Sequence, residues 1–350
     1  MNSQALEIVK GYQGKPIRIM EVCGTHTHEI FRLGIRQILP PSIHLISGPG
    51  CPVCVTPIDY IDQAIELAEV HHCTICTFGD LIRVPGTHSS LQKARSKGAK
   101  IEMVFSPLEA EAYAKAHPEE EVVFLAVGFE TTTPLACMAV RNAQADGLKN
   151  FSLLVANKTM DQAYLALKDS ADVFLYPGHV ATITGCQIYE DLKKQGISGV
   201  VAGFTASELI MALAVIIKRY EKGEPFFVNC YPRVVSQEGS KSGRELIASV
   251  MEPVDSQWRG LGVIPQSGLR LKDAYAAFDA QKKYALQPSL GKANPLCRCG
   301  DILKGECTPE QCPVYGKGCT PEHPIGACMV SNEGACSAYY KYAIKKYAIK

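Results

Sequence analysis

Several features that define membrane or secreted proteins are missing from this sequence. It contains no run of about 18 apolar residues, so we expect no membrane-spanning helix. Its first residues do not combine a basic start, an apolar stretch and a small-residue cleavage site, so no secretory signal is expected. We therefore expect the protein in the cytoplasm, where cysteine clusters more often bind metal or act in catalysis than form disulfide frameworks.

An excess of charge of one sign is also missing. The 36 basic and 35 acidic residues give a formal net charge of +1 and are spread along the chain. Because no basic stripe is available to contact phosphates, nucleic acid is not an expected partner.

Short apolar, β-branched runs alternate with helical patterns between residues 17 and 220. This alternation is typical of parallel sheets covered by helices. The expected strands are 17–22, 43–47, 73–78, 101–105, 122–127, 151–156, 173–176 and 199–202. The expected helices include 57–70, 107–117, 133–146, 160–170 and 206–220.

The expected fold class is α/β, with two parallel-sheet domains and a smaller cysteine-rich domain. We place the domains at residues 1–117, 118–222 and 223–350. The third domain has an expected strand at 226–230 and helices near 243–251 and 271–284. Since it has little apolar material for a core, we expect a metal centre to hold it together.

Chemically reactive residues recur directly after predicted strands. Cys23 and His26 follow the first strand, and Cys51 and Cys54 follow the second. The other such segments are Gly79-Asp80, the loop with Glu130, Asn157-Lys158 and Pro177-Gly-His179. Because ligands bind beyond the carboxyl ends of parallel strands, we expect these loops to share one cleft.

Cys51-Pro-Val-Cys54 is a C-x-x-C pair just before an expected helix. Thr56-Pro57 is typical of a helix start, and a helix amino end lowers the pKa of a nearby thiol. The pair is therefore either a dithiol/disulfide couple or two thiolate ligands. The alternative is a tight turn whose cysteines only pack.

Cys23-Gly-Thr-His26-Thr-His28 places one thiol and two imidazoles within six residues. Iron and zinc accept such a sulfur–nitrogen mixture. Alternatively, Cys23 is a nucleophile and His26 its base. His26 is the favoured functional partner, while the roles of His28 and His179 stay open.

Gly128-Phe-Glu130-Thr-Thr-Thr-Pro134 resembles a phosphate-binding turn but lacks both a lysine and the G-x-G-x-x-G spacing. Glu130 is therefore interpreted as a residue that orients a histidine or a metal ligand. A helix-capping role for the threonine run has nearly equal weight.

The last 54 residues contain seven of the fifteen cysteines, namely Cys297, Cys299, Cys307, Cys312, Cys319, Cys328 and Cys336. They do not form two C-x-x-C knuckles, which counts against a zinc ribbon. Four cysteines suffice for a [4Fe–4S] cluster, but composition does not assign which four. The remaining cysteines are expected to be small buried residues, namely Cys73, Cys76, Cys137, Cys186 and Cys230.

Together these motifs resemble the HypD family of hydrogenase maturation factors, from about residue 15 to the C-terminus. The segments that carry the resemblance are Cys23–His28, Gly48–Cys54, Gly128–Thr132, Gly326–Ser331 and Glu333–Tyr340. The resemblance implies two α/β domains and a third, iron–sulfur domain. It implies a scaffold that holds one iron while cyanide and carbonyl ligands are added, as a transient Fe(CN)2CO unit.

The resemblance also implies partners and site residues. The partners are a HypC-type chaperone, a HypE-type cyanide donor and, indirectly, the large subunit of a [NiFe] hydrogenase. The implied cluster ligands are Cys297, Cys312, Cys319 and Cys336. Cys299 and Cys328 are implied as a second redox pair, and Cys307 lies outside the pattern. Whether Cys51 and Cys54 bind iron or transfer electrons stays open.

Two other classes of function compete with this scaffold, which is not a conventional turnover enzyme. One is a stand-alone thiol-dependent transferase or oxidoreductase with structural zinc in its tail. The other is a structural adaptor whose cysteines serve stability alone. The metal content of the purified protein discriminates among the three.

Overall fold

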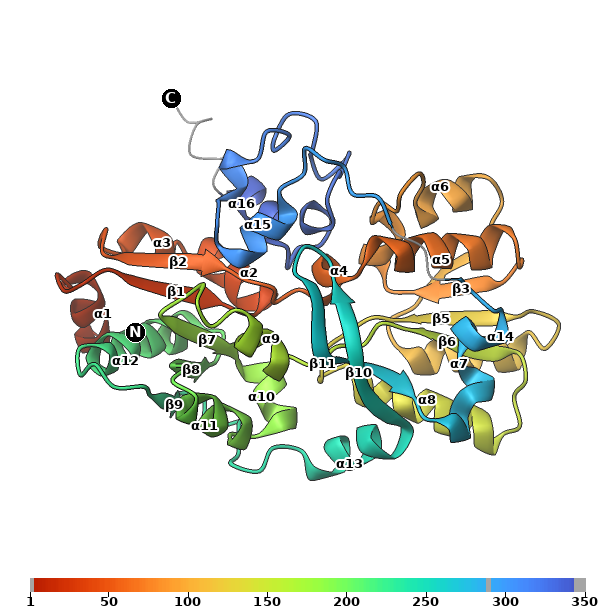
Figure 1. Cartoon of the computed structure of the whole chain (residues 1–350), viewed down its shortest axis with the longest axis horizontal. Helices are drawn as coiled ribbons and strands as arrows, with labels where there is room; N and C mark the ends of the chain where they lie inside the picture. The colour runs from red at the N-terminus through yellow and green to blue at the C-terminus, as the bar shows by residue number, and fades with distance from the viewer. Residues whose placement is uncertain (1–2, 288–290, 343–350) are drawn as a thin grey trace.

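The computed structural model of the protein describes residues 3–287 and 291–342. Two lobes lie side by side along the long axis, each built around a parallel β-sheet (Figure 1). An antiparallel hairpin lies between the lobes, and the cysteine-rich C-terminal segment packs over the same region. The expected α/β class with parallel sheets is therefore confirmed.

The first lobe contains sheet A, whose five parallel strands are ordered β2-β1-β7-β8-β9. The strands are β1 (Ile17–Glu21), β2 (Ile43–Ser47), β7 (Val173–Pro177), β8 (Gly199–Ala202) and β9 (Phe227–Asn229). The helices of this lobe are α1 (Ser3–Lys10), α2 (Gly24–Arg32), α3 (Ile35–Ile38), α10 (Gly178–Thr184), α11 (Gln187–Lys194) and α12 (Ala206–Tyr220). Ile17 and Ile19 pack in the same core cluster as α1 and α12, whereas Met20 belongs to the larger core that reaches the second lobe.

The second lobe contains sheet B, whose four parallel strands are ordered β4-β3-β5-β6. The strands are β3 (Thr74–Thr77), β4 (Ile101–Met103), β5 (Val122–Ala126) and β6 (Phe151–Val155). The helices connected to them are α4 (Pro52–Val55), α5 (Ile58–Glu69), the 3₁₀ helix η1 (Gly79–Arg83), α6 (Leu91–Ser96), α7 (Pro107–Ala116), α8 (Thr133–Ala145) and α9 (Asp161–Ala166). The nearly continuous burial of β3, β5 and β6 matches strands covered on both faces.

All nine expected strands are present, with their ends within two residues of the expected positions. Their grouping differs from the expected division at residue 117. β3 and β4 precede that residue and pair with β5 and β6 beyond it, while β1 and β2 join the later strands of sheet A. The expected boundary thus crosses sheet B, because chain order does not determine which parallel strands become neighbours.

The hairpin between the lobes was not expected from the sequence. It consists of β10 (Met251–Trp258) and β11 (Gly262–Leu271), with a register shift between Val254 and Ser256. The helix expected at 271–284 is wrong in its first part, because β11 ends at Leu271 and a 3₁₀ helix follows. Pro253 made strand β10 difficult to predict, because proline within a run favours an edge strand or no strand.

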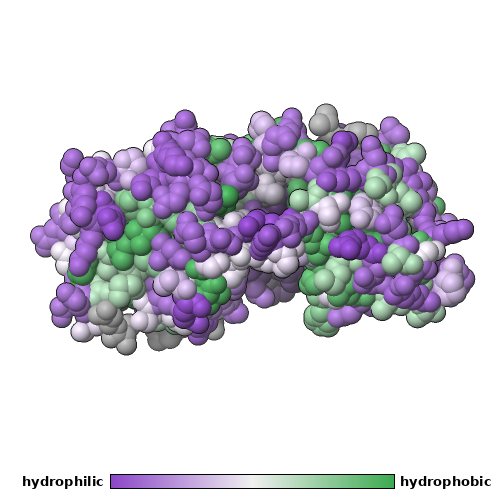
Figure 2. Space-filling view, turned by 90° about the horizontal axis from the view of Figure 1, so that it is seen from below, coloured by the Kyte–Doolittle hydropathy of each residue, from purple (hydrophilic) through white to green (hydrophobic). Residues whose placement is uncertain are grey.

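The C-terminal part is built from short helices joined by turns. The elements before and within it are α13 (Lys241–Val250), η2 (Asp273–Phe278), α14 (Ala280–Lys283), α15 (Cys299–Lys304), η3 (Pro309–Gln311), η4 (Ala327–Met329) and α16 (Ala335–Tyr342). Seen from below, the two lobes flank a central hollow, and hydrophobic patches interrupt a mainly hydrophilic surface on both (Figure 2). Among residues 3–287 and 291–342, no helix combines the length and the apolar character needed to cross a bilayer.

Candidate functional site

The loops after β1 and β2 pack backbone against backbone. Cys23 is the N-cap of α2, and Cys51 is the N-cap of α4. The Gly24 N–H donates to Gly50 O at 3.0 Å. A Cβ on Gly50 would lie 2.2 Å from Cys23 N, so only glycine permits this approach. The two predicted motifs are thus brought together at the carboxyl edge of sheet A.

Cys51 and Cys54 are joined by a disulfide, with their Cα atoms 5.2 Å apart. Both are buried, and the Cys54 N–H lies 3.2 Å from Cys51 Sγ. On its other side, Cys54 Sγ lies 4.0 Å from Ala327 O, next to Cys328 in the tail. The pair therefore stands between the loop of Cys23 and the cysteine-rich segment.

Cys23 is buried at the amino end of α2. Burial raises the pKa of the Cys23 thiol to about 12, although hydrogen bonds from the backbone of His26 and Thr25 oppose the rise. The free thiol is consequently protonated at neutral pH. A metal ion that bound there would displace this proton.

His26 is fully buried, and its imidazole points toward the loop after β8. Its Nε2 lies 3.0 Å from Gly203 O and donates to that carbonyl, which leaves Nδ1 as a bare acceptor. Burial lowers the pKa of His26 to about 4, so the ring is neutral at pH 7. Within the described residues Nδ1 has no hydrogen-bond partner, so its lone pair is available to a metal ion.

His28 and His179, the other two histidines of the motifs, occupy different surroundings. His28 Nε2 lies 3.2 Å from the Tyr342 hydroxyl, so it contacts α16 rather than the buried loop. His179 stacks on Phe204 with ring centroids 4.0 Å apart, and Phe204 also packs against His26 at 4.7 Å. His179 therefore lies near the Cys23 site through an aromatic contact.

Glu130 occupies the corresponding position after β5 in sheet B. Its Oε1 accepts the Met160 N–H at 2.8 Å, while Oε2 has no hydrogen-bond partner in the described part of the chain. Burial raises the pKa of Glu130 to about 7, and Asp161 adds to the rise. Glu130 and Cys23 both contribute to raising the pKa of Tyr164, whose main cause is burial. Tyr164 therefore lies within electrostatic reach of both Glu130 and Cys23.

Tyr164 belongs to a buried aromatic group with Tyr176 and Tyr189. The ring centroids of Tyr164 and Tyr189 lie 4.9 and 4.4 Å from that of Tyr176. None of the three hydroxyls has a hydrogen-bond partner among residues 3–287 and 291–342. The three hydroxyls therefore form a polar group that is closed to bulk solvent.

Lys158, which follows β6, points away from this region. Its Nζ donates to Ser256 Oγ at 2.6 Å and to Gln257 O at 2.8 Å, both on the hairpin. Burial lowers the pKa of Lys158 to about 7, opposed by Asp59. The loops of Cys23 and Cys51 therefore pack together at the strand ends, whereas this lysine is directed to the hairpin.

The tail cysteines gather in a compact, largely buried group. Cys297 Sγ lies 3.2 Å from Cys299 Sγ, and Cys299 also contacts Cys336, whose thiol pKa is raised chiefly by that contact and by burial. A Cβ on Gly326 would lie 2.4 Å from Cys299 Sγ and 2.7 Å from Cys297 Sγ. The Ile325 N–H donates to Cys319 Sγ at 3.3 Å. Glycine at 326 therefore leaves space that the sulfur atoms use.

The three remaining tail cysteines differ in their burial. Cys312 is buried with Sγ 3.7 Å from Leu296 O, Cys328 is fully buried, and Cys307 is half-buried. Cys299 and Cys328 are both free thiols, as are all cysteines of the described residues except Cys51 and Cys54. Among the described residues, no group of three or more His, Cys, Asp or Glu side chains is arranged to hold a metal ion.

The tail cysteines are nevertheless donors of the kind that an iron–sulfur cluster uses. A cluster spreads its thiolate ligands over several irons, so they need not converge on one point. The tail supplies buried thiols, an N–H directed at Cys319 and a glycine cradle at Gly326. Hydrogen bonds to sulfur and exclusion of water are the factors that tune such centres.

The tail also covers the loop of Cys23. Thr25 Oγ1 donates to Glu333 Oε1 at 2.9 Å, and a Cβ on Gly24 would lie 2.3 Å from Glu333 Cβ. Arg83, in η1 after β3, donates to Val330 O at 3.4 Å. The carboxyl ends of both sheets therefore meet the same segment of the tail.

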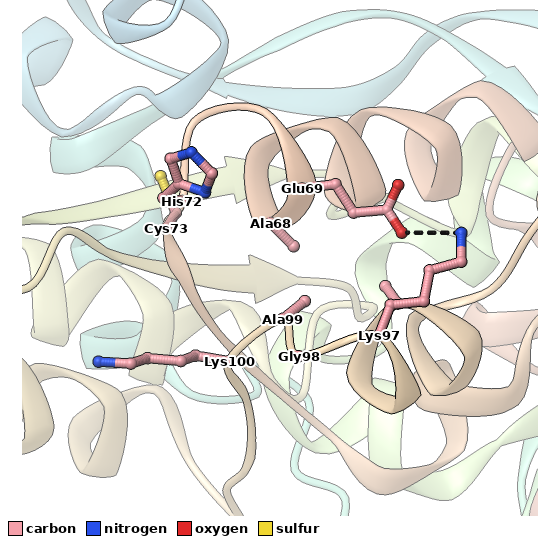
Figure 3. A pocket seen from close by; sticks show the side chains of 9 residues that line it. Ala68, Glu69, His72, Cys73, Lys97, Gly98, Ala99 and Lys100 are labelled. Atoms are coloured by element: carbon pink, nitrogen blue, oxygen red, sulfur yellow. Dashed lines mark hydrogen bonds and ion pairs between the residues drawn. The ribbon is translucent and has the colours of Figure 1, made fainter.

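A separate pocket of about 410 Å³ lies at the opposite, amino edge of β3 and β4 (Figure 3). Glu69 and Lys97 form an ion pair across it at 3.4 Å, and Cys73 lies in its wall. It contains none of the residues that the motifs indicated. Cys73 and the other packing cysteines are buried as expected, except that Cys230 is half-buried.

Comparison with known proteins decides the family. A family model for HypD, described as "Hydrogenase formation hypA family", matches residues 2–343. The chain is 42% identical over 344 residues to "Hydrogenase maturation factor HypD" of Azotobacter vinelandii, covering 95% of this chain and 91% of that protein. It is 40% identical over 334 residues to the protein of the same name from Escherichia coli strain K12, with 94% and 90% covered. The chain belongs to the HypD family.

Membership in the HypD family of hydrogenase maturation factors confirms the resemblance drawn from the motifs. The matched range contains both sheets, the hairpin and the whole described tail. A third relative is the "Hydrogenase expression/formation protein HupD" of Azotobacter chroococcum mcd 1, 43% identical over 343 residues, with 95% of this chain and 90% of that protein covered.

Sequence reasoning missed several residues of the site in this HypD-family chain. Tyr164 and Arg259 carry no motif, and only the packing of distant segments brings them to the sulfur atoms. Glu333 stands in a motif that signalled the family, but its contact with Thr25 joins positions 308 residues apart. No local pattern predicts such a contact.

Proposed function

We propose that the protein is an assembly scaffold for the [NiFe] hydrogenase metal centre. With a HypC-type partner, it holds one iron while cyanide and carbonyl ligands are added. The observation that supports this most is the meeting of Cys23, the Cys51–Cys54 disulfide and the tail cysteines at one interface in a HypD-family chain.

Cys23 is the proposed thiolate for the iron cargo. Its buried thiol is protonated when free, so binding the iron releases one proton. His26, in the same helix turn, is neutral at pH 7, and its bare Nδ1 is a candidate second donor to the iron. Soft sulfur suits an iron that carries cyanide and carbonyl. Glu130 and Tyr164 are proposed to hold protons in the closed region beside Cys23.

The tail is proposed to hold a [4Fe–4S] cluster through Cys297, Cys312, Cys319 and Cys336. When bound, the cluster supplies one-electron transfer. Cys299 and Cys328 form the proposed second redox pair. Because Cys297 and Cys336 each contact Cys299, exchange of a ligand with this pair is the main alternative within the proposal.

The Cys51–Cys54 disulfide is proposed to exchange electrons with the tail. Cys328 follows Ala327, whose carbonyl oxygen lies 4.0 Å from Cys54 Sγ. If the Cys299/Cys328 dithiol reduces the disulfide, two electrons and two protons pass to Cys51 and Cys54, and the tail pair becomes the disulfide. The Cys51 and Cys54 thiols formed in this way can then serve as iron ligands or as a reductant.

The proposal includes two further partner proteins. A HypE-type protein is the proposed cyanide donor, and a hydrogenase large subunit is the proposed recipient of the finished iron unit. The cytoplasm is the proposed location, since its reducing conditions keep the free thiols available.

The test is anaerobic co-purification of the Cys23→Ser protein with its HypC-type partner. Serine keeps the size of the side chain but replaces a metal-binding thiolate by a hydroxyl. We expect infrared cyanide and carbonyl bands to disappear while tail iron is retained. Cys230→Ser, at a half-buried cysteine outside the site, is the matched control. Cyanide-bearing iron at wild-type level on the Cys23→Ser protein refutes the assignment.

Metal analysis of the same preparation separates the competing functions. Brown protein with about four tail irons per chain supports the scaffold. Colourless protein with stoichiometric zinc supports a thiol-dependent enzyme with a structural zinc site. Metal-free protein with unchanged folding leaves the structural adaptor.

A further inference from the structure

A positively charged side chain stands at the tip of the β10–β11 hairpin, against the tail. Arg259 directly follows the fully buried Trp258, and its backbone N–H donates to Val55 O at 2.8 Å. The next residue, Gly260, has φ +80°, and a Cβ there would lie 2.4 Å from Gly300 Cα. The hairpin tip is thereby held between the Cys51–Cys54 helix and the backbone after Cys299.

The guanidinium of Arg259 is incompletely satisfied. Nη2 donates to Pro85 O at 3.2 Å, whereas Nη1 is shielded from solvent and has no partner among the described residues. Part of the residue reaches the surface, but this end of the side chain does not. A charged group in this position is costly unless a negative charge compensates it.

The groups that act on the Arg259 charge are mainly the tail cysteines. Burial lowers the pKa of the guanidinium, and Cys299, Cys328 and Cys297, in that order, oppose the decrease. The one carboxylate that contributes, Asp62, has the weakest influence and is already bonded to Thr87, with its Oδ1 2.8 Å from the Thr87 N–H. Arg259 forms no salt bridge with any described residue. Because Gly260 packs on Gly300, directly after Cys299, a negative charge formed at the cysteine group would compensate Arg259.

We propose that Arg259 is a fixed positive charge that sets the reduction potential of the tail's sulfur centre. The inference rests on the cluster of the proposed function. When the cluster takes one electron from a low-potential donor, its negative charge increases by one, and no protein bond forms or breaks. Arginine stays protonated throughout, so it stabilises the reduced form more than the oxidised form and raises the potential.

The experiment compares two Arg259 variants of the full chain, purified anaerobically. Arg259→Met removes the charge and keeps an apolar stem, whereas Arg259→Lys keeps the charge. The midpoint potential is measured by titration with dithionite and mediators. For Arg259→Met we expect the oxidised-to-reduced equilibrium to shift at least tenfold toward the oxidised form, about 59 mV lower for one electron. Arg259→Lys should shift it by less than half as much.

Arg83→Met is the matched control, because this exposed arginine also contacts the tail through the carbonyls of Pro321 and Val330. Its potential should remain at the wild-type value. A wild-type potential in Arg259→Met with normal iron content overturns the inference. If Arg259→Met loses its iron, Arg259→Gln, which retains a donor for Pro85 O, replaces it with the same expected shift.

The inference can also be tested if the proposed function is wrong and the tail holds no cluster. If wild-type protein binds no cluster iron, the tail thiols are equilibrated with glutathione buffers and their oxidation is followed by mass spectrometry. Arg259 would still favour ionised thiols, so at a pH at which the tail thiols ionise Arg259→Met should shift the two-electron equilibrium about tenfold toward the disulfide, or about 30 mV. An unchanged equilibrium between thiols and disulfide would overturn the inference even for protein that binds no cluster.

Discussion

The site at the strand ends and the site in the tail use the same element, sulfur, in opposite structural settings. Cys23, Cys51 and Cys54 follow hydrogen-bonded strands of one sheet, which position them through backbone register. The tail cysteines stand on turns and on helices of three to eight residues. The first site is therefore ordered by its scaffold, whereas the second depends on what its sulfurs bind.

The largest effect that would test this contrast comes from removing a proposed cluster ligand. Cys312→Ala should abolish most tail iron and open residues 291–342 to limited proteolysis, because these short helices have little core of their own. The fragment containing sheets A and B should stay protected. Cys307→Ala, at a half-buried cysteine outside the ligand set, is the control. Unchanged iron and proteolysis would show that the tail is ordered without Cys312.

A substitution at Gly50 tests the site at the strand ends. Gly50→Ala places a methyl group 2.2 Å from Cys23 N, and backbone on both sides cannot move aside. We expect a loss of about 3 kcal/mol in the free energy of unfolding, measured by urea denaturation, with tail iron retained. Gly318→Ala is the control, since its Cβ would meet only Ile325 Cδ1 at an ordinary 3.7 Å. Equal stability of the two variants would refute the close packing of the loops.

Glu130→Gln tests whether the strand-end region is closed to water. The folded protein raises the pKa of Glu130 from 4.5 to about 7, so the neutral form is preferred in the fold. Wild-type stability should fall as pH rises from about 4.5 to about 7 and then level off. The glutamine variant lacks this decrease and should gain about 2–3 kcal/mol relative to wild type at pH 8 compared with pH 4.

Urea denaturation across this pH range measures the difference. Glu119→Gln, in the turn before β5, provides a control carboxylate in an exposed position. Parallel pH profiles for wild type and Glu130→Gln would mean that Glu130 is hydrated in the fold.

The smallest expected effect concerns the contact between the two regions. Thr25→Val removes the hydroxyl that donates to Glu333 Oε1 and keeps the shape of the side chain. We expect a loss of about 1–2 kcal/mol, because the largely buried carboxylate loses a donor. The double variant Thr25→Val with Glu333→Gln should lose less than the sum of the two single changes. Additive losses would mean that the tail covers α2 without this bond.

The sequence predicted the strands and the loops that follow them well, because the signals for these elements are local. Each expected strand exists, and Cys23, Cys51 and Glu130 follow strands as expected. The Cys51-Pro-Val-Cys54 spacing allowed a disulfide or a ligand pair, and the structure contains the disulfide. Local alternation and cap residues depend on neighbours within a few positions, which is why they can be seen in a single sequence.

The tail was less predictable, because its order depends on contacts over long separations. Spacing alone did not reveal that Cys297 and Cys336 both contact Cys299. Nor did it reveal the hairpin that brings Arg259 to these cysteines. The proposed ligand assignment thus remains a prediction for iron analysis of the cysteine variants.

By itself the sequence determined the α/β class, the positions of the strands and the reactive loops at their carboxyl ends. Periodicity and turn chemistry carry this information within short segments. Only the tertiary structure decided that β1 and β2 pair with β7–β9, and that Glu333 and Arg259 meet the sulfur sites. Lateral strand order and contacts between distant segments follow from how whole elements pack, a free energy that no short stretch of residues contains.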